Sequence, residues 1–320
     1  MLSTVLAPLA MHMPDGFLSV PVSIVLWVMS IVVIAYALVR VNAELGEKQV
    51  PIMGVMAAAI FAGQMLNFPV SGGTSGHLIG AALATIVLGP WASILVMTSV
   101  VSIQALLFQD GGWLVMGGNL FNMAIVSTVV AYAAYTLVRR FTGNSRTGIL
   151  AGGALSGWLA VVMAALACAL ELAISGTFRA DLALPAMAGI HAVIGLGEGL
   201  ITFGALSFLM ASRPDLLKMG TEKQKGGAII VVGGLIAAIA LAILSPIASS
   251  NPDGLEYIAE QNGFLAKAQS PSFQLIPDYV FPGISSPAVA TIVAGIIGVL
   301  VVFGVAFGIA YARKRRTSQV

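Results

Sequence analysis

The sequence has very little charge. Only 9 % of its 320 residues are Asp, Glu, Lys or Arg, whereas about a quarter are charged in an ordinary soluble domain. Hydrophobic residues make up 58 % of the chain, which excludes a water-soluble globular protein. The net charge of +2 is too small and too dispersed to indicate a nucleic-acid partner.

Cysteine and several familiar motifs are also scarce or absent. The single cysteine, Cys168, lies in an apolar run, so no disulfide can form within the chain, and we interpret it as a small buried hydrophobic residue. The sequence contains no GxxxxGK[ST], HExxH or CxxC motif. Any ATP-driven activity therefore requires an ATPase on another chain.

Long apolar stretches make up most of the chain. About 20 apolar residues cross roughly 30 Å of hydrocarbon. One stretch, 77–108, is too long for a single span and contains Gly89-Pro90, where proline breaks the helix, so we divide it in two. The sequence thus predicts an all-α polytopic membrane protein with a seven-span core and a two-span tail. The nine spans are expected near 18–40, 51–66, 77–108 (two), 114–138, 147–174, 184–211, 227–246 and 287–312.

The basic residues predict the orientation of these spans. With the N-terminus outside and the C-terminus in the cytoplasm, 13 of the 15 Lys and Arg residues fall on the cytoplasmic side, as is typical of membrane proteins. Only Arg179 and Lys267 fall outside. Most acidic residues also fall outside, so the external face favours cations.

The composition divides the chain into segments. The N-terminal ten residues are expected to be absent from the mature chain, because either translation starts at Met11 or a peptidase cuts after Ala10. The alternative is that they extend the first external segment. The predicted segments are the extension 1–10, a transmembrane core 11–212, a cytoplasmic linker 213–226, and a two-span domain 227–316 with an external loop 247–286.

Three histidines, all expected on the external side, are the candidate metal ligands: His12, His77 and His191. If Met11 is the N-terminus, its amine, the backbone nitrogen of His12 and the His12 imidazole can close small chelate rings around one ion. A nitrogen from His77 would complete a flat set of four nitrogens, which suits Ni(II), Cu(II) or low-spin Co(II) better than zinc. With the extension attached, the amine becomes an amide and this ligand is lost. The other interpretation is that each histidine is a hydrogen-bonded structural residue.

Two polar residues within predicted spans are further candidates. Glu198 is an acid in the middle of a span, and His191 lies seven residues earlier, so both fall on one helix face about 10 Å apart. Such residues could line a polar interior beneath the metal site or form a hydrogen-bonded pair that packs helices. Gln104, close to Asp110, leaves the same two interpretations open.

Four sequence blocks resemble one transporter family. MHMPDGFL, NFPVSGGTSGHLIGAALA, SIQALLFQDGG and GGNLFNMA follow one another in this order. They resemble the CbiM/NikM family, the substrate-binding (S) membrane components of energy-coupling-factor (ECF) transporters for cobalt and nickel, over about residues 11–212. The resemblance implies that the terminal amine, the second-residue histidine and the histidine after TSG hold the metal. These roles fall on Met11, His12 and His77.

The tail resembles the PDGLE domain, a NikN/CbiN-like two-span component, through its motif at Pro252–Glu256. The combined resemblance implies Co²⁺ or Ni²⁺ as transported substrate, no organic cofactor, and no enzyme activity in this chain. It implies a transmembrane coupling (T) subunit and two cytoplasmic ATPase subunits as partners. It further implies a place in the bacterial cytoplasmic membrane, with the metal site facing outside, and for cobalt members a link to cobalamin biosynthesis.

Two other classes of function compete with metal uptake. Ser75 lies in a GTSG sequence, and with His191 as base it would form the dyad of an intramembrane serine protease similar to the rhomboid proteases. The loop tryptophan–arginine pair and the additional histidines of that family are not found in the sequence. The third interpretation is a transporter or scaffold without metal, which leaves a histidine directly after a candidate start methionine unexplained.

Overall fold

The structure is a computed structural model that describes residues 12–44, 49–217, 227–271 and 273–317. Residues 1–10, Met11 and positions 218–226 of the predicted linker lie outside the described residues. The elements up to residue 217 are α1 Val20–Glu44, α2 Gln49–Gln64, β1 Phe68–Val70, β2 Thr74–Gly76, α3 Ala81–Leu88, α4 Pro90–Phe108, α5 Met116–Leu120, the π-helix η1 Phe121–Val126, α6 Ser127–Thr142, α7 Arg146–Ile174, α8 Ala180–Ser212 and the 3₁₀ turn η2 Pro214–Leu217. Those of the tail are α9 Gly227–Leu244, η3 Ser245–Ile247, α10 Gly254–Gln261, η4 Leu265–Lys267, η5 Pro277–Tyr279 and α11 Pro287–Thr317.

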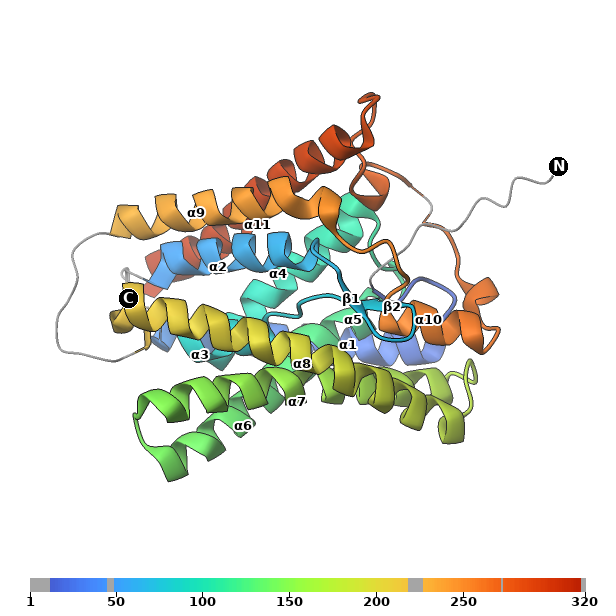
Figure 1. Cartoon of the computed structure of the whole chain (residues 1–320), viewed down its shortest axis with the longest axis horizontal. Coiled ribbons are helices and arrows are strands. Elements are labelled where there is room, and N and C mark those ends of the chain that lie inside the picture. The colour runs from blue at the N-terminus through green and yellow to red at the C-terminus, as the bar shows by residue number, and fades with distance from the viewer. Residues whose placement is uncertain (1–11, 45–48, 218–226, 272, 318–320) are drawn as a thin grey trace.

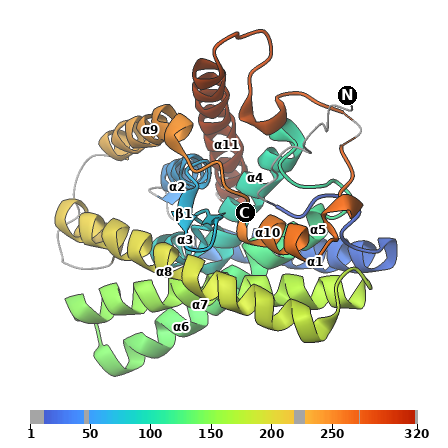
Figure 2. The same cartoon turned by 45° about the vertical axis from the view of Figure 1, so that its right-hand side comes forward.

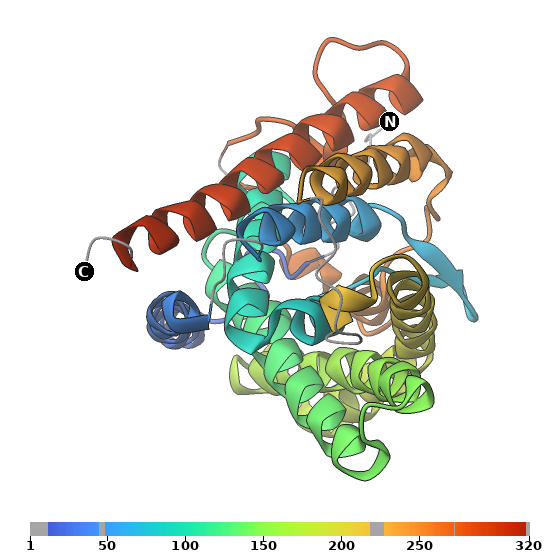
Figure 3. The ribbon, with the colours of Figure 1, turned by 90° about the vertical axis from the view of Figure 1, so that its left-hand side faces the viewer.

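The long helices run roughly along one axis and form a helical bundle (Figure 1). Seen along that axis, α6, α7 and α8 form one side, α2, α9 and α11 form the other, and α3 and α4 lie between them (Figure 3). The tail is not separate from the rest, because α9 and α11 both pack against α2. At Gly54 of α2, an added Cβ would lie 2.9 Å from the Phe303 ring of α11. The absence of a side chain at this position lets the two helices approach closely.

The structure confirms an all-α membrane fold and modifies the expected set of spans. Among the described residues, seven helices are long and apolar enough to cross a membrane. The other two expected spans are shorter. Helix α2 has 16 residues, roughly 24 Å, and α3 has only eight, roughly 12 Å.

Helix α3 is short because residues 77–80, which precede it, are not helical. They form no regular element, and Gly80 takes a left-handed φ of 82°. Gly89, with φ 86°, then separates α3 from α4, and Pro90 begins α4. The predicted division at Gly89-Pro90 is thus correct, whereas the first of the two pieces is a half-helix preceded by irregular backbone.

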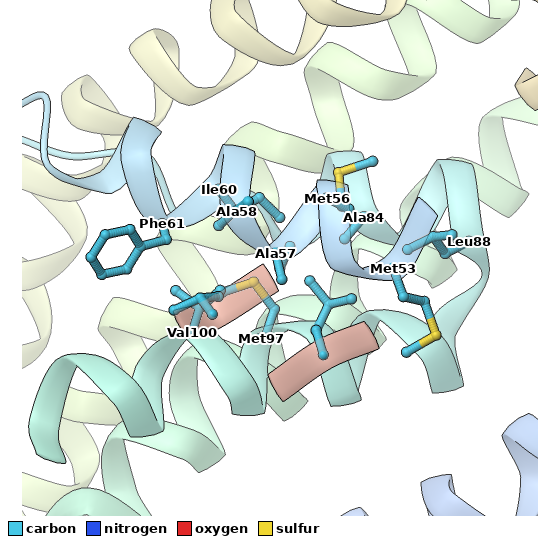
Figure 4. Close-up of a cluster of buried hydrophobic side chains, with 14 of the residues drawn as sticks. Met53, Met56, Ala57, Ala58, Ile60, Phe61, Ala84, Leu88, Met97 and Val100 are labelled. Carbon is cyan, nitrogen blue, oxygen red and sulfur yellow. The ribbon is translucent and has the colours of Figure 1, made fainter. Parts of the chain in front are cut away.

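Apolar packing around α3 holds this half-helix in the centre of the bundle. In Figure 4, Met53, Ala57 and Ile60 of α2 lie beside Ala84 and Leu88 of α3, with Met97 and Val100 of α4 below them. All seven side chains are buried. The segment between His77 and α4 therefore has little freedom to move.

One end of the bundle carries basic residues: Arg139 and Arg140 at the end of α6, Arg146 at the start of α7 and Arg213 just after α8 (Figure 1). The β1–β2 hairpin, α10 and the loops around them lie toward the other end (Figures 1 and 2). This separation is consistent with the predicted orientation, which remains a prediction because no membrane is present. The segment of the tail between α9 and α11 lies against the end of the core that contains His12.

Candidate metal centre

The chain just after His12 is anchored by a set of backbone and amide hydrogen bonds. Met13 N–H donates to Asn119 Oδ1 at 3.1 Å, and Asn119 Nδ2 donates back to the Met13 carbonyl at 3.1 Å. The Met13 carbonyl also accepts from Gly112 N–H at 2.9 Å. Because both polar groups of Met13 are bonded deep in the fold, its neighbour His12 has a defined position.

Asp15 provides a second anchor. Its carboxylate accepts hydrogen bonds from the backbone N–H groups of Trp113, Leu114 and Val115 at 2.8–3.1 Å. The contact requires glycine at 112, because a Cβ there would lie 2.2 Å from Asp15 N. The loop after α4 and the N-terminal segment thus hold each other in place.

His12 and His77 come together at this point. Their ring centroids are 5.6 Å apart with the planes at 75°. His12 is only 4 % exposed, and its Nδ1 forms an ion pair with Asp110 Oδ1 at 3.0 Å. His77 Nδ1 donates to the Leu78 carbonyl at 3.1 Å. A proton on Nδ1 leaves the lone pair of a neutral imidazole on Nε2.

His12 Nε2 is buried and has no hydrogen-bond partner within the part of the chain that the structure describes. His12 lines a cavity of about 90 Å³ together with His77, His191, Asn119, Asn122, Asp253 and apolar residues of α7 and α8. A buried nitrogen without a partner carries a desolvation cost that a metal ion would offset. No group of three or more His, Cys, Asp or Glu that could hold a metal is found among the described residues, and Met11 lies outside them.

The charged groups beside His12 favour a cation. Burial lowers the pKa of His12, but the charge and hydrogen bonds of Asp110 outweigh it, so the pKa lies above its ordinary value. Burial raises the pKa of Asp110, yet the attraction of His12 and the hydrogen bonds from His12 and Tyr279 hold it below its ordinary value. Burial raises the pKa of Asp253 to about 7. Asp253 lines the cavity, whereas Asp110 stands behind His12, so both carboxylates lie close enough to favour a cation there.

His191 and Glu198 have different neighbours among the described residues. His191 lines the cavity, and its Nδ1 donates to the Met187 carbonyl at 2.9 Å. Glu198 does not line it; its two carboxylate oxygens accept from Ile79 N–H at 2.7 Å and Gly80 N–H at 2.9 Å. These donors stand at the start of α3, where free N–H groups and the helix dipole attract a carboxylate. Glu198 therefore fixes the backbone that follows His77.

Gln104 is fully buried on α4 and also lies away from the cavity lining found among the described residues. Its backbone carbonyl accepts from Asp110 N–H at 3.0 Å. The contribution that the structure shows for Gln104 is therefore to the loop that carries Asp110.

The tail closes the site from outside through Pro252–Glu256. Ser75 N–H donates to the Pro252 carbonyl at 2.8 Å, next to a parallel bridge between Ser75 and Asp253. Asp253 caps α10 by accepting from Glu256 N–H at 2.7 Å. Gly254 is needed for close approach, because a Cβ there would lie 2.8 Å from Ile194 and 2.9 Å from His191 on α8. The motif thus joins the β1–β2 hairpin, α8 and the cavity.

Two segments of this chain match known protein families. Residues 12–216 match the CbiM family, described as the cobalt uptake substrate-specific transmembrane region. The chain belongs to the CbiM family. Residues 227–315 match the PDGLE domain, so this CbiM protein carries its PDGLE domain in the same chain.

Similar proteins share this arrangement in whole or in part. A putative fused nickel transport protein NikMN of Archaeoglobus fulgidus is 37 % identical over 311 residues, which cover 96 % of this chain and 100 % of that protein. The cobalt transport protein CbiM of Sorangium cellulosum is 36 % identical over 58 % of this chain and 84 % of its own. A crystal structure of a truncated transition metal transporter has a TM-score of 0.57 at 35 % identity and covers 63 % of this chain and 99 % of that one. The chain is an integral membrane protein of this transporter family.

The serine protease interpretation finds no support in this geometry. Ser75 is fully buried, and its hydroxyl donates to the Asn251 carbonyl at 2.8 Å, with the Pro252 carbonyl at 3.3 Å. The hydrogen bond of His191 is to Met187. Ser75 attaches the tail to the hairpin, and a serine–histidine dyad is not formed by the described residues.

Sequence reasoning missed several residues that build this centre, above all Asn119, Asp15 and Asp253. Asn119 lies in the GGNLFNMA block that carried the family resemblance, but nothing in the block indicated a partner in the N-terminal segment. Asp15 and Asp253 each precede a glycine in a PDG sequence, a pattern that by itself indicates only a turn. Their partners lie about 100 residues or more away, so local patterns could not identify them.

Proposed function

We propose that this CbiM protein takes up Co²⁺ or Ni²⁺ as the substrate-binding subunit of an ECF-type transporter. The metal would be held by the amine of Met11, by His12 and by His77, once residues 1–10 are absent. The proposal includes a transmembrane coupling subunit and two cytoplasmic ATPase subunits as partners, which supply the ATP hydrolysis that this chain has no motif for. It places the chain in the bacterial cytoplasmic membrane with the metal site facing outside, and it requires no organic cofactor.

The observation that carries the proposal is the pairing of His12 with His77 at one cavity. Two imidazoles 5.6 Å apart, one with a buried nitrogen that has no hydrogen-bond partner among the described residues, are suited to share a borderline-soft divalent ion. The residue before His12 is Met11, so a free amine at that position would lie one peptide unit from the same ion. Names of relatives support both metals, since they are called nickel or cobalt transport proteins.

Chelation by His12 has a specific requirement in this site. Only Nδ1 of a histidine can close a six-membered ring with its own backbone nitrogen. Nδ1 of His12 is paired with Asp110 at 3.0 Å, so chelation must replace this ion pair and release a proton. Coordination through Nε2 would instead keep Asp110 behind the ring, as carboxylates often stand behind metal-bound histidines. Both modes require a neutral imidazole.

The decisive experiment is intact mass spectrometry of the membrane-purified chain, under conditions that retain metal, followed by metal analysis of the same sample. A chain that begins at Met11 and carries one equivalent of nickel or cobalt is the expected result. A chain that retains Met1 and carries no metal would refute the ligand set. Uptake assays on His12→Ala and His77→Ala should both show loss of accumulation, with His191→Gln as the matched change of a cavity histidine outside the proposed ligand set and a smaller expected loss.

A further inference from the structure

Sulfur-containing residues make up part of the lining of the cavity beside His12. Met13, Met123, Cys168 and Met187 all border it, and all four are buried. They come from four separate segments, namely the N-terminal segment, η1, α7 and α8. Two of them touch, because Cys168 Sγ donates to Met13 Sδ at 3.4 Å. These two residues, Cys168 and Met13, are called the sulfur pair below.

The surrounding structure holds the sulfur pair in place. The backbone of Met13 is bonded to Asn119 through both its N–H and its carbonyl. Gly118 leaves room for the Met13 side chain, since a Cβ there would lie 3.1 Å from Met13 Cε. Cys168 lies within the 29 residues of α7. The thiol and the thioether form only a weak hydrogen bond with each other, so a cation can replace this contact at little cost.

Thiol and thioether sulfurs select soft cations such as Cu(I) and Ag(I), whereas Mg²⁺ and Ca²⁺ prefer oxygen ligands. Buried cysteine and methionine often serve only for packing, but the sulfur pair borders a cavity. The neighbouring His12 lines the same cavity and has a buried Nε2 without a hydrogen-bond partner among the described residues. The cavity therefore offers a cation both space and two soft donors.

The charge balance of binding favours a monovalent cation. The S–H bond of Cys168 breaks, a bond from its sulfur to the cation forms, and the proton goes to water, because the thiolate is the form that binds metal. Met13 contributes a lone pair and loses no proton. A monovalent cation thus replaces a proton of equal charge, and the buried site gains no net charge. A divalent cation would add a positive charge where burial makes charge costly.

We propose that Cys168 and Met13 bind a soft monovalent cation, Cu(I) or Ag(I), at this cavity. The two ligands that the site requires are sulfurs, so it differs in its ligands from the site proposed for cobalt or nickel. It requires neither the amine of Met11 nor a nitrogen of His12 or His77. The site therefore goes beyond the proposed uptake of Co²⁺ or Ni²⁺ and does not depend on it.

The test is titration of the full chain, purified in detergent, with Ag⁺ in chloride-free buffer by calorimetry. Repeating it in buffers of different ionisation enthalpy should show that the tightest-bound ion releases about one proton. Cys168→Ser replaces the soft sulfur by oxygen and should weaken binding of this ion by more than the roughly 10- to 100-fold that loss of a supporting residue costs a metal site.

Met13→Leu removes the thioether at nearly constant volume and should weaken binding of the same ion by about 10-fold or more. Met53→Leu is the matched control. Met53 is fully buried on α2 and is not among the described residues that line the cavity, so its replacement should leave the affinity for Ag⁺ within about 2-fold of wild type. Thermal unfolding of the silver-free variants shows whether each one folds.

X-ray absorption at the copper edge identifies the ligands without any substitution. The wild-type chain loaded with Cu(I) in the absence of oxygen should show sulfur neighbours, and this result decides the question even if Cys168→Ser does not fold. Nitrogen neighbours alone would overturn the sulfur site, as would affinities for Ag⁺ that both variants of the sulfur pair leave within about 2-fold of wild type. A chain that binds Ag⁺ in this way but neither nickel nor cobalt would refute the proposed function and leave the sulfur site standing.

Discussion

Replacement of Glu198 by glutamine should weaken metal binding although Glu198 does not touch the metal cavity. Its carboxylate accepts two short hydrogen bonds, from Ile79 N–H at 2.7 Å and Gly80 N–H at 2.9 Å, and the side chain is fully buried. The glutamine amide can accept only one of them through its oxygen, because its NH₂ group would face the other donor. One backbone N–H then remains without a partner in a buried place, at a cost of about 1–3 kcal/mol.

This cost falls on the segment that carries His77. If the segment must return to its wild-type position for the metal to bind, the free-energy cost converts to an apparent affinity lower by at most about 5- to 150-fold. Loss of the negative charge near the start of α3 adds to the effect, since a carboxylate is stabilised by the N-terminal end of a helix. The assay is a competition titration with a metal chelator at constant pH, together with thermal unfolding of the metal-free chain.

Glu171→Gln is the matched control. Glu171 is a second buried glutamate, on α7, and it accepts from Asn122 Nδ2 at 2.8 Å, not from the backbone that follows His77. It should lower the thermal stability and weaken metal binding less than Glu198→Gln does, although its partner Asn122 lines the cavity. The reasoning is refuted if Glu198→Gln binds nickel or cobalt as tightly as wild type, or if the two glutamine variants weaken binding equally.

Three further predictions concern Gly112, Gly254 and Glu256. Gly112→Ala places a Cβ 2.2 Å from Asp15 N, so metal retention should fall and the free energy of unfolding should drop by about 1–3 kcal/mol, as thermal unfolding would show. The control is Gly189→Ala on α8, where a Cβ meets nothing within 4 Å; it should stabilise the helix by about 0.5–1 kcal/mol. Gly254→Ala should loosen the tail and increase protease cleavage within 247–286, and unchanged cleavage would contradict the proposed close packing. Burial, with the charge of Asp253, raises the pKa of Glu256 to about 8. Ionisation of Glu256 therefore costs the folded state no stability below about pH 4.5 and progressively more as the pH rises toward 8. Glu256→Gln should stabilise the chain at about pH 8.5 and not at about pH 4.5, and melting curves at the two pH values test this sign.

The fold class could be predicted from sequence because composition and run length alone determine whether a helix can cross a membrane. The break between Leu88 and Pro90 was also predictable, since proline cannot continue a helix. The half-helix α3 was not. Leu78, Ile79 and Gly80 give no sign in the sequence that they are not helical. Their backbone is irregular in the structure, and Ile79 N–H and Gly80 N–H bond to Glu198 of another helix.

The proposed metal ligands could be chosen from the sequence where their chemistry is local. A histidine that follows a candidate N-terminal methionine indicates chelation, and the TSGH sequence added His77 through the family resemblance. The contacts of Asn119, Asp110 and Tyr279 were beyond such reasoning, because each has its partner on a distant segment. Glu198 and His191 lie on one helix face but have different hydrogen-bond partners. Their shared face therefore did not indicate the partner of either residue.

The hydrogen bond from Gln269 N–H to the Asp15 carbonyl, at 2.8 Å, joins the first described segment of the chain to one of the last. The hydrogen bond from the Tyr279 hydroxyl to Asp110 also joins residues far apart in the sequence. Such contacts are expected to form late in folding, because a long loop must close before they can stabilise the fold. The N-terminal segment leaves the ribosome first, yet its final contacts wait for residues near the C-terminus. A partly synthesised chain would therefore have an incomplete cavity. A truncated chain that ends before the tail would lack Asp253, Gly254 and Leu255, which line the cavity in the full chain.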